Sequence, residues 1–294
     1  HRYSYYMKPF NYSAPQDLDS CYEIVDKLGK SAYFMAGGTD LLVRIKTGRI
    51  SPNEIVDIKN IKEIRSRIER NEEWIEVGAL TLISEIQHNS SIEKYFPALK
   101  EAAGSVGSVQ IRNRATIGGN LCNASPAADT VPALLIYNAK IKLVSTGGSR
   151  VIPLDQFLLG PGKTALQPGE LLQTIILPLP TLRQAESYER LSRRRGVDLA
   201  IVNICAQVIA SGKVRVAVGA AGPVAFVVED QSGILINPDT EEEVKNEKLV
   251  ELMQIASPIS DIRASKEYRQ AMLAVLAKRA LQRASSQLNS KKGL

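Results

Sequence analysis

The sequence has few cysteines, and no two of them have the spacing of a metal site. Cys21, Cys122 and Cys205 lie far apart, and only two histidines accompany them. Structural zinc sites and iron–sulfur clusters take their ligands mainly from closely spaced cysteines and histidines. We therefore expect this chain to hold no metal ion or iron–sulfur cluster of its own.

Long hydrophobic runs and a signal sequence are also missing. The longest apolar runs, such as residues 131–136, fall far short of the roughly 20 residues that a membrane helix needs. Residues 1–10 mix aromatic and charged side chains, whereas a signal peptide has a continuous apolar core. These absences predict a soluble, cytoplasmic protein with no membrane span.

Aromatic side chains are scarce, and the positive charge is not concentrated. Phe, Trp and Tyr make up 5% of the 294 residues, and the net charge of +6 comes from Lys and Arg spread among 31 acidic residues. Single-stranded nucleic acids bind to aromatic side chains within a basic groove, and a basic pI without such a patch is weak evidence. We expect no nucleic-acid partner, and a nucleic-acid-binding or scaffold protein is the alternative that the charge suggests.

The first 60 residues have the pattern of a short βαβ unit. A helix is predicted over residues 17–28, and strands are predicted at residues 33–35 and 54–58. Ala36-Gly37-Gly38-Thr39-Asp40 follows the first strand directly. Adjacent glycines let a ligand approach the backbone, and successive N–H groups form a concavity that suits phosphate oxygens. A Gly-Gly turn by itself is more often only a turn, and no GxGxxG motif supports a Rossmann site.

Residues 61–178 hold a second group of helices and strands. The expected elements are a strand at 74–79, helices at 81–88, 91–103 and 129–137, and a strand at 141–144. Thr81, Ser91 and Asp129 are each expected at the N-terminal end of their helix, where a side-chain oxygen caps the first free N–H groups.

A polar segment within this second group, residues 110–129, has Thr116-Ile117-Gly118-Gly119-Asn120 at its centre. So many small and polar residues cannot form a packed core element, so the segment either wraps a ligand or is disordered. Apolar elements flank the segment on both sides, which argues against disorder. We expect a ligand-binding loop here.

Two prolines within residues 177–180 mark the start of an expected last domain. Residues 199–209 and 214–220 are predicted to form paired strands around Ser211-Gly212-Lys213. The tail is predicted to be helical over residues 241–255 and 264–288. An apolar stripe in the last helix is interpreted as core packing, and it consists of Tyr268, Met272, Val275 and Leu276.

Four segments together resemble one known family. They are AGGTDL at 36–41, QIRNRATIGGNLCNASPAADTVPALL at 110–135, GPGKTAL at 160–166 and YERLSRRRGVDLAIVN at 188–203. They resemble the FAD-binding subunit of the molybdenum hydroxylases, the medium subunit of aerobic-type carbon monoxide dehydrogenase and bacterial xanthine dehydrogenase. The likeness runs from about residue 10 to about residue 220, and the segment around TIGGN is its most specific part.

The resemblance implies an α+β fold. Two FAD-binding α+β subdomains, at residues 7–60 and 61–178, would precede a smaller C-terminal antiparallel sheet-plus-helix domain at residues 179–294. The implied FAD-binding residues are Ala36, Gly37, Gly38, Thr39, Asp40, Leu41, Ala115, Thr116, Gly118, Gly119, Asn120, Cys122, Asp129, Leu172 and Tyr188. No catalytic acid, base or nucleophile is expected in this chain, because the redox chemistry belongs to the cofactor.

The resemblance also implies a place for several of these residues. The two glycine loops would hold the pyrophosphate, and Asp40 would face FAD with its backbone because a carboxylate repels phosphate. Asp129 would lie on the adenine or ribose side, with a helix N-cap as the structural alternative. Leu172 would pack on the flavin ring, with ordinary core packing as its alternative. Tyr188 would begin a loop that shields one flavin face.

The expected loop also contains Arg193-Arg194-Arg195, which we interpret as a solvated face or a subunit contact. Glu189 stands where some relatives carry a lysine. The electron acceptor therefore stays open between NAD, a quinone, oxygen and another carrier.

The implied function is electron transfer within a larger complex. A large molybdopterin subunit would oxidise the substrate, a small subunit with [2Fe–2S] clusters would pass electrons to FAD, and two such heterotrimers would form a dimer. The substrate would be chosen by another chain. The alternative is a stand-alone flavin oxidoreductase of the same FAD-binding superfamily. Such an enzyme needs its own substrate pocket and usually a catalytic acid, and the last third of the sequence offers no candidate.

Overall fold

The computed structural model describes residues 8–194 and 197–290. The expectations about residues 1–7 and about Arg195 in the arginine run concern parts of the chain outside these ranges. Within them, no helix combines the length and the apolar character that crossing a membrane requires.

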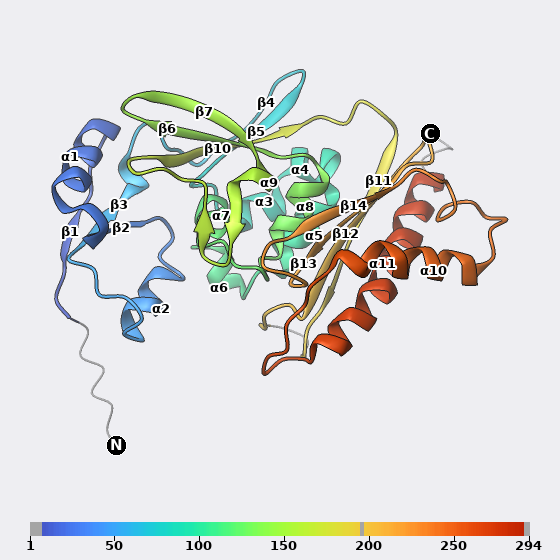
Figure 1. The fold of residues 1–294 in the computed structure, drawn as a ribbon. Helices are drawn as coiled ribbons and strands as arrows, with labels where there is room; N and C mark the ends of the chain where they lie inside the picture. The colour runs from blue at the N-terminus through green and yellow to red at the C-terminus, as the bar shows by residue number, and fades with distance from the viewer. Residues whose placement is uncertain (1–7, 195–196, 291–294) are drawn as a thin grey trace.

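The amino-terminal part forms a three-stranded parallel sheet in the order β1-β3-β2 (Figure 1). Its elements are β1 (Asn11–Ser13), α1 (Leu18–Leu28), η1 (Gly29–Ser31), β2 (Ala32–Met35), α2 (Leu41–Lys46), β3 (Glu54–Asp57) and η2 (Ile58–Asn60). Asp17 caps α1 by accepting from the Ser20 N–H at 2.9 Å. The predicted helix at residues 17–28 and the predicted strands at 33–35 and 54–58 are confirmed as α1, β2 and β3, whereas β1 and the connecting helix α2 were not predicted.

The middle of the molecule is a five-stranded antiparallel sheet in the order β4-β5-β10-β6-β7, with helices on one side of it (Figure 1). The strands are β4 (Ile68–Arg70), β5 (Trp74–Gly78), β6 (Lys140–Ser145), β7 (Gly148–Pro153) and β10 (Leu171–Pro178). The helices are α3 (Ile83–His88), α4 (Ser90–Tyr95), α5 (Pro97–Ser105), α6 (Val109–Arg112), α7 (Ile117–Asn123), α8 (Thr130–Ile136) and α9 (Leu154–Phe157). A small antiparallel hairpin consists of β8 (Leu158–Gly160) and β9 (Lys163–Thr164).

The predicted cap by Thr81 is wrong. Its hydroxyl instead bonds to the backbone of Arg67, accepting from N at 3.1 Å and donating to O at 3.0 Å. Glu85 takes over at the start of α3 by accepting from the Leu82 N–H at 2.7 Å. Thr81 therefore fixes the segment before β4 rather than a helix end.

The single helix predicted over residues 91–103 is two helices. Pro97 has no N–H to continue a helix and begins α5 instead. Asn89, and not Ser91, caps α4 by accepting from the N–H groups of Ser91 and Ile92 at 2.9 and 3.0 Å.

The carboxyl-terminal part is a four-stranded antiparallel sheet in the order β11-β12-β13-β14. Its elements are β11 (Gln184–Leu191), β12 (Val202–Ile209), β13 (Val214–Gly219), β14 (Phe226–Asp230), α10 (Glu242–Leu252), η3 (Met253–Ile255) and α11 (Lys266–Ser290). α11 packs on β11 and β12, while α5 and α8 pack against the same sheet. The predicted hairpin of β12 and β13 is confirmed, whereas β11 and β14 were not predicted.

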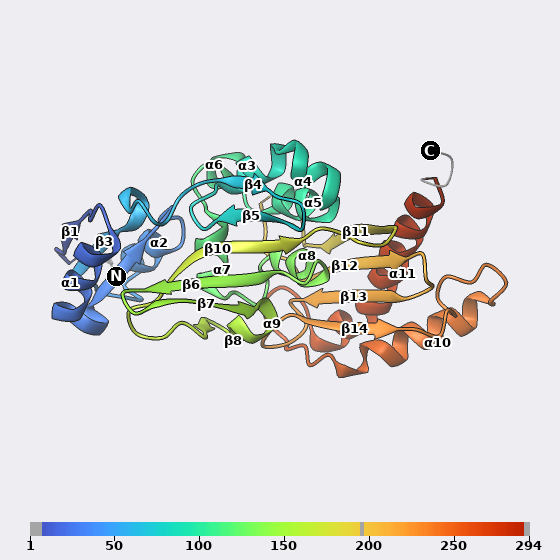
Figure 2. The ribbon, with the colours of Figure 1, turned by 90° about the horizontal axis from the view of Figure 1, so that it is seen from above.

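The three sheets follow one another along the molecule (Figure 2). One apolar core is shared by the first two sheets and extends to Tyr188, Cys205 and Ala217 of the last sheet, and a second core lies between the last sheet and α11. The α+β class is confirmed. We keep the division at residues 60 and 178 as a proposal.

The apolar stripe predicted for α11 is shifted. Tyr268 and Val275 are 47% and 41% exposed, although Leu276 is buried as expected. The buried face instead includes Arg269, whose guanidinium donates to the Ile201 carbonyl at 2.6 Å. A buried cation that ties a helix to a strand was not visible in the apolar pattern.

Asp261 neutralises this buried cation, with its Oδ1 2.7 Å from Nη2 of Arg269. Burial would raise the pKa of Asp261, but hydrogen bonds from Arg263 and Arg269 outweigh it and hold the pKa well below its usual range. Because the folded-state pKa is lowered, the stabilisation is present above the ordinary carboxyl range and is lost as the pH falls through the lowered pKa.

We predict that Asp261→Asn lowers the free energy of unfolding by about 2 kcal/mol at neutral pH, because Arg269 loses its counter-ion. Urea unfolding followed by circular dichroism measures this loss, and the difference from the unmodified chain should shrink in acid. Asp239→Asn, at an exposed site, is the control and should change little. Equal stability of both variants at neutral pH would contradict the assigned ion pair.

Candidate cofactor-binding site

The two glycine loops predicted from the sequence lie against each other. The first glycine loop (residues 36–40) joins β2 to α2. The second glycine loop (residues 114–120) runs from the end of α6 into the first turn of α7, so Gly118 and Gly119 are helical and not in the open loop expected from the sequence. A Cβ atom on Gly37 would lie 1.9 Å from the carbonyl oxygen of Arg114. Only a residue without a side chain allows this approach, so glycine at position 37 is what lets the two loops meet.

The second glycine loop is anchored on the middle sheet. A Cβ atom on Gly118 would lie 2.7 Å from the Cβ atom of Ala79, which directly follows β5. The Gly118 N–H donates to the Ala79 carbonyl at 2.9 Å, and the Ile117 N–H donates to the Thr81 carbonyl at 3.0 Å. The loop is thus held by backbone contacts to a rigid element.

The start of α7 uses its own N–H groups internally. Thr116 caps the helix by accepting from the Gly119 N–H at 3.1 Å, and its carbonyl accepts from the Asn120 N–H at 2.9 Å. Oδ1 of Asn120 accepts from Thr130 at 2.7 Å, which leaves the Asn120 NH2 group as a donor. A Cβ atom on Gly119 would lie 2.9 Å from Oγ1 of Thr116 and 3.9 Å from the Cβ of Ala36, so a larger side chain would displace the capping hydroxyl and fill the space between the loops.

The first glycine loop supplies backbone donors that the protein does not use. In the part of the chain that the structure describes, the N–H groups of Gly37, Gly38, Thr39 and Asp40 have no hydrogen-bond acceptor. Gly38 adopts φ +74°, which few other residues accept. The Asp40 side chain does not cap α2. Successive free donors of this kind can form a concavity suited to an anion.

Three other expected residues surround the loops. Leu41 begins α2, and Ala115 is buried with its carbonyl accepting from the Ile83 N–H at 2.9 Å. Burial raises the pKa of Cys122 to about 12, so its thiol stays protonated at neutral pH and is no nucleophile. Leu172 is buried in the core of the first two sheets.

Asp129 belongs to a buried polar cluster that joins α8 to the last sheet. Its Oδ1 accepts from Tyr188 at 2.8 Å, from Nε of Arg190 at 2.9 Å and from Nδ2 of Asn203 at 3.3 Å. Asp129 precedes α8 but makes no side-chain cap, so the predicted capping role is wrong. Burial raises the pKa of Asp129, although the charge of Arg190 opposes the shift.

Tyr188 lies within β11 and not in a loop, so any loop over a ligand begins after Leu191. The Tyr188 ring is 6% exposed, and burial together with the Asp129 charge raises its pKa well above the usual value. Arg193 and Arg194 lie in the expected loop, 43% and 73% exposed, and both are ion-paired with Asp198.

Sequence reasoning did not single out Arg190 or Asn203. Asn203 is one of two polar residues in the otherwise apolar β12, and that isolation was its only signal. Arg190 alternates with Tyr188 on β11, so both side chains reach Asp129 from the same face of the strand. The strand itself had to be recognised before this pairing could be predicted.

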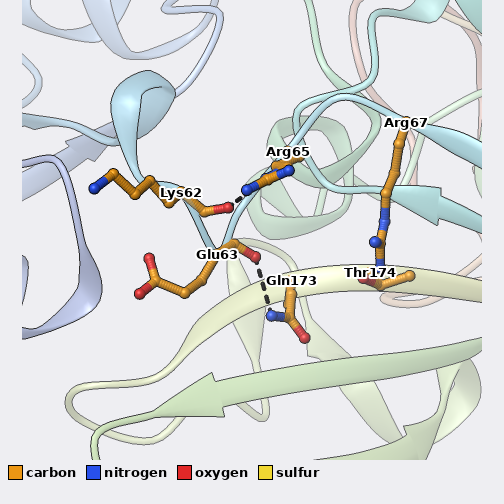
Figure 3. A pocket seen from close by; sticks show the side chains of 6 residues that line it. All are labelled: Lys62, Glu63, Arg65, Arg67, Gln173 and Thr174. Carbon is orange, nitrogen blue, oxygen red and sulfur yellow. Dashed lines mark hydrogen bonds between the residues drawn. The ribbon is translucent and has the colours of Figure 1, made fainter.

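Two cavities lie away from the glycine loops. The first, of about 240 Å³, is lined by Lys62, Glu63, Arg65, Arg67, Gln173 and Thr174 (Figure 3). Its lining includes the acidic residue Glu63, and Arg67 pairs with Glu69 and Glu76 at 3.3 and 2.8 Å. This balance of charge makes it a poor anion site. The second cavity, of about 210 Å³, lies between α10 and α11, and neither lining includes a residue of the two glycine loops.

Comparison with known proteins agrees with this geometry. Residues 8–180 match the family described as the FAD binding domain in molybdopterin dehydrogenase. The chain belongs to this family. Residues 186–284 match a second family, described as the CO dehydrogenase flavoprotein C-terminal domain.

Relatives of this family cover nearly the whole chain. A xanthine dehydrogenase FAD-binding subunit of Escherichia coli O157:H7 is 30% identical over 258 residues, covering 86% of this chain and 88% of the relative. The carbon monoxide dehydrogenase medium chain of Hydrogenophaga pseudoflava is 29% identical, with 92% and 96% covered. A solved structure of reconstituted CO dehydrogenase from Oligotropha carboxidovorans matches with a TM-score of 0.86 at 26% identity, covering 95% of this chain and 98% of that one.

The predicted family is therefore confirmed, and the chain is a flavoprotein of an oxidoreductase family whose cofactor is FAD. The free N–H groups of the first glycine loop fit the diphosphate of that cofactor, because they offer donors without a capping carboxylate. The individual FAD contacts of the expected residues stay predictions.

We predict that Gly37→Ala destabilises the folded chain by about 2 kcal/mol, because the new methyl group would press on the Arg114 carbonyl. Thermal or urea unfolding measures the change. The matched control is Gly147→Ala in the exposed β6–β7 turn, where the nearest atom is 3.7 Å away. Indistinguishable unfolding of the two variants would show that the loops are not packed as described.

Proposed function

We propose that this chain binds FAD with its diphosphate on the first glycine loop and serves as the electron-transfer subunit of a molybdopterin-dependent dehydrogenase. One observation carries the proposal: four successive backbone N–H groups, Gly37 to Asp40, lack acceptors beside a second glycine loop in which the N–H groups of residues 117–120 are all bonded within the protein. Hydrogen bonds from neutral donors to an ionised phosphate are stronger than those between neutral groups.

The second glycine loop would add side-chain donors. The Thr116 hydroxyl and the Asn120 NH2 group lie at the start of α7, and each is oriented by one internal hydrogen bond. The Asp40 backbone would face the diphosphate while its side chain stays outside. Asp129 and Tyr188, which are hydrogen-bonded to each other beside the last sheet, complete the proposed FAD-binding set together with Leu172 and Cys122.

FAD, when bound, supplies both one-electron and two-electron redox chemistry. The protein would bind the cofactor, orient it and exclude water around it. A stand-alone flavin oxidoreductase would need a catalytic acid, and Asp129 is the buried carboxyl group in the proposed site. Its Oδ1 accepts three hydrogen bonds, which makes it a poor proton donor for a substrate. This arrangement favours electron transfer over a stand-alone flavin oxidoreductase.

The relatives are named as medium chains or FAD-binding subunits, which supports a complex with other chains. We propose a large molybdopterin subunit and a small subunit with [2Fe–2S] clusters as partners, assembled as a dimer of heterotrimers. Electrons would pass from those clusters through FAD to an external acceptor. The exposed pair Arg193 and Arg194 fits a contact with an acidic partner.

We predict that the full chain, purified with its partners or reconstituted with FAD, shows the absorption bands of bound flavin. Gly119→Val should abolish FAD retention while circular dichroism stays unchanged, because the side chain would displace the Thr116 hydroxyl and fill the space between the loops. Gly147→Val in the β6–β7 turn is the control and should retain FAD. A chain that binds no flavin would overturn the proposed function, and full FAD content in Gly119→Val would overturn the loop assignment.

A further inference from the structure

We propose that Lys59 is a positioning residue for FAD, because its ammonium group holds the carbonyl at the start of the first glycine loop. Nζ of Lys59 donates to the Ala36 carbonyl at 3.2 Å. This inference rests on the proposed function and deepens it, since it names a residue outside both glycine loops that sets the geometry of the diphosphate site.

The fold brings Lys59 to the loop. β2 and β3 pair in parallel with Met35 opposite Asp57, so both strands end at the same edge. The chain after β2 enters the glycine loop, and the chain after β3 enters η2, which contains Lys59. A lysine two residues beyond the end of one strand can therefore reach the first residue beyond the other.

Asp57 holds the Lys59 side chain in place. Its Oδ2 lies 2.6 Å from Nζ of Lys59, and its Oδ1 accepts from the Lys59 backbone N–H at 3.0 Å. Tyr12 donates its hydroxyl hydrogen to the same carboxylate. The Asp57 side chain is 6% exposed, whereas that of Lys59 is 39% exposed. The lysine head is thus held by a buried anion and still reaches the loop.

The ionisation of Asp57 suits this role. Burial would raise its pKa, but the hydrogen bonds from Lys59 and Tyr12 outweigh burial and lower the pKa below the usual value. Asp57 is therefore ionised at neutral pH and acts as a fixed counter-ion. Because the pair is neutral overall, Lys59 works through its hydrogen bond more than through long-range attraction.

The hydrogen bond to Ala36 determines where the first free donor points. In a trans peptide the carbonyl of one residue and the N–H of the next point in opposite directions, and no described peptide bond is cis. The Ala36 carbonyl points toward Lys59, so the Gly37 N–H points away from it. Gly37 begins the run of four unused donors, so Lys59 aligns the start of the anion-binding concavity.

The test measures FAD affinity of the full chain by titration, with folding checked by circular dichroism. Lys59→Met should weaken FAD binding about tenfold, the effect of losing one hydrogen bond to a charged group. Lys59→Arg should recover most of the affinity, since it keeps a cationic donor. Lys62→Met is the matched control, because Lys62 is a nearby exposed lysine without a contact to the loop. The FAD affinity of this variant should equal that of the unmodified chain.

Asp57→Asn separates positioning from simple charge. If Lys59 acts by holding the loop, loss of its anchor should weaken FAD binding; if Lys59 acted only as a positive charge near phosphate, removing the anion should strengthen binding. Tighter binding by Asp57→Asn, or unchanged binding by Lys59→Met, would overturn the inference.

The amide resonances of the ligand-free chain give a readout that does not need FAD. Lys59→Met should shift the Gly37 and Gly38 signals in a proton–nitrogen correlation spectrum, and Lys62→Met should leave them in place. An unmodified chain that binds no FAD would overturn the proposed function, while this spectrum would still test the contact. Unshifted loop signals in Lys59→Met would overturn the positioning role.

Discussion

The contact between Gly37 and the Arg114 carbonyl is the constraint on which the candidate site depends. The two residues belong to separate glycine loops, far apart in the sequence, and a single methyl group would prevent their approach. Each loop is tied to its own sheet, the first through the end of β2 and the second through Ala79 after β5. The contact therefore sets how the first sheet lies against the second.

The two loops have different physical roles despite their similar sequences. The N–H groups of residues 117–120 in the second loop donate to acceptors within the protein, whereas those of Gly37 to Asp40 in the first loop stay free for the proposed anion. Both loops are supported by polar residues outside the glycines. The pair of Lys59 and Asp57 holds the first loop, and the cluster around Asp129 ties the region after the second loop to the last sheet.

Local signals in the sequence predicted much of the fold. Adjacent glycines after a strand, a turn at residues 211–213 and helical periodicity each depend on neighbouring residues, and the corresponding elements are present. Predictions that required distant partners were less successful. Asp129 has the sequence context of a helix cap, but its carboxylate accepts hydrogen bonds from Tyr188 and Arg190 on β11. That strand was not predicted, because polar residues occur along most of its length. Lys59 gave no signal at all, because its target is a carbonyl brought near by strand pairing.

The central claim is that the backbone of the first glycine loop binds the diphosphate of FAD. A crystal structure of the full chain with FAD bound tests it most directly. We expect diphosphate oxygens within hydrogen-bonding distance of the N–H groups of Gly37 to Asp40, with the Ala36 carbonyl still turned to Lys59. A diphosphate bound elsewhere, with these N–H groups facing only water, would contradict the account.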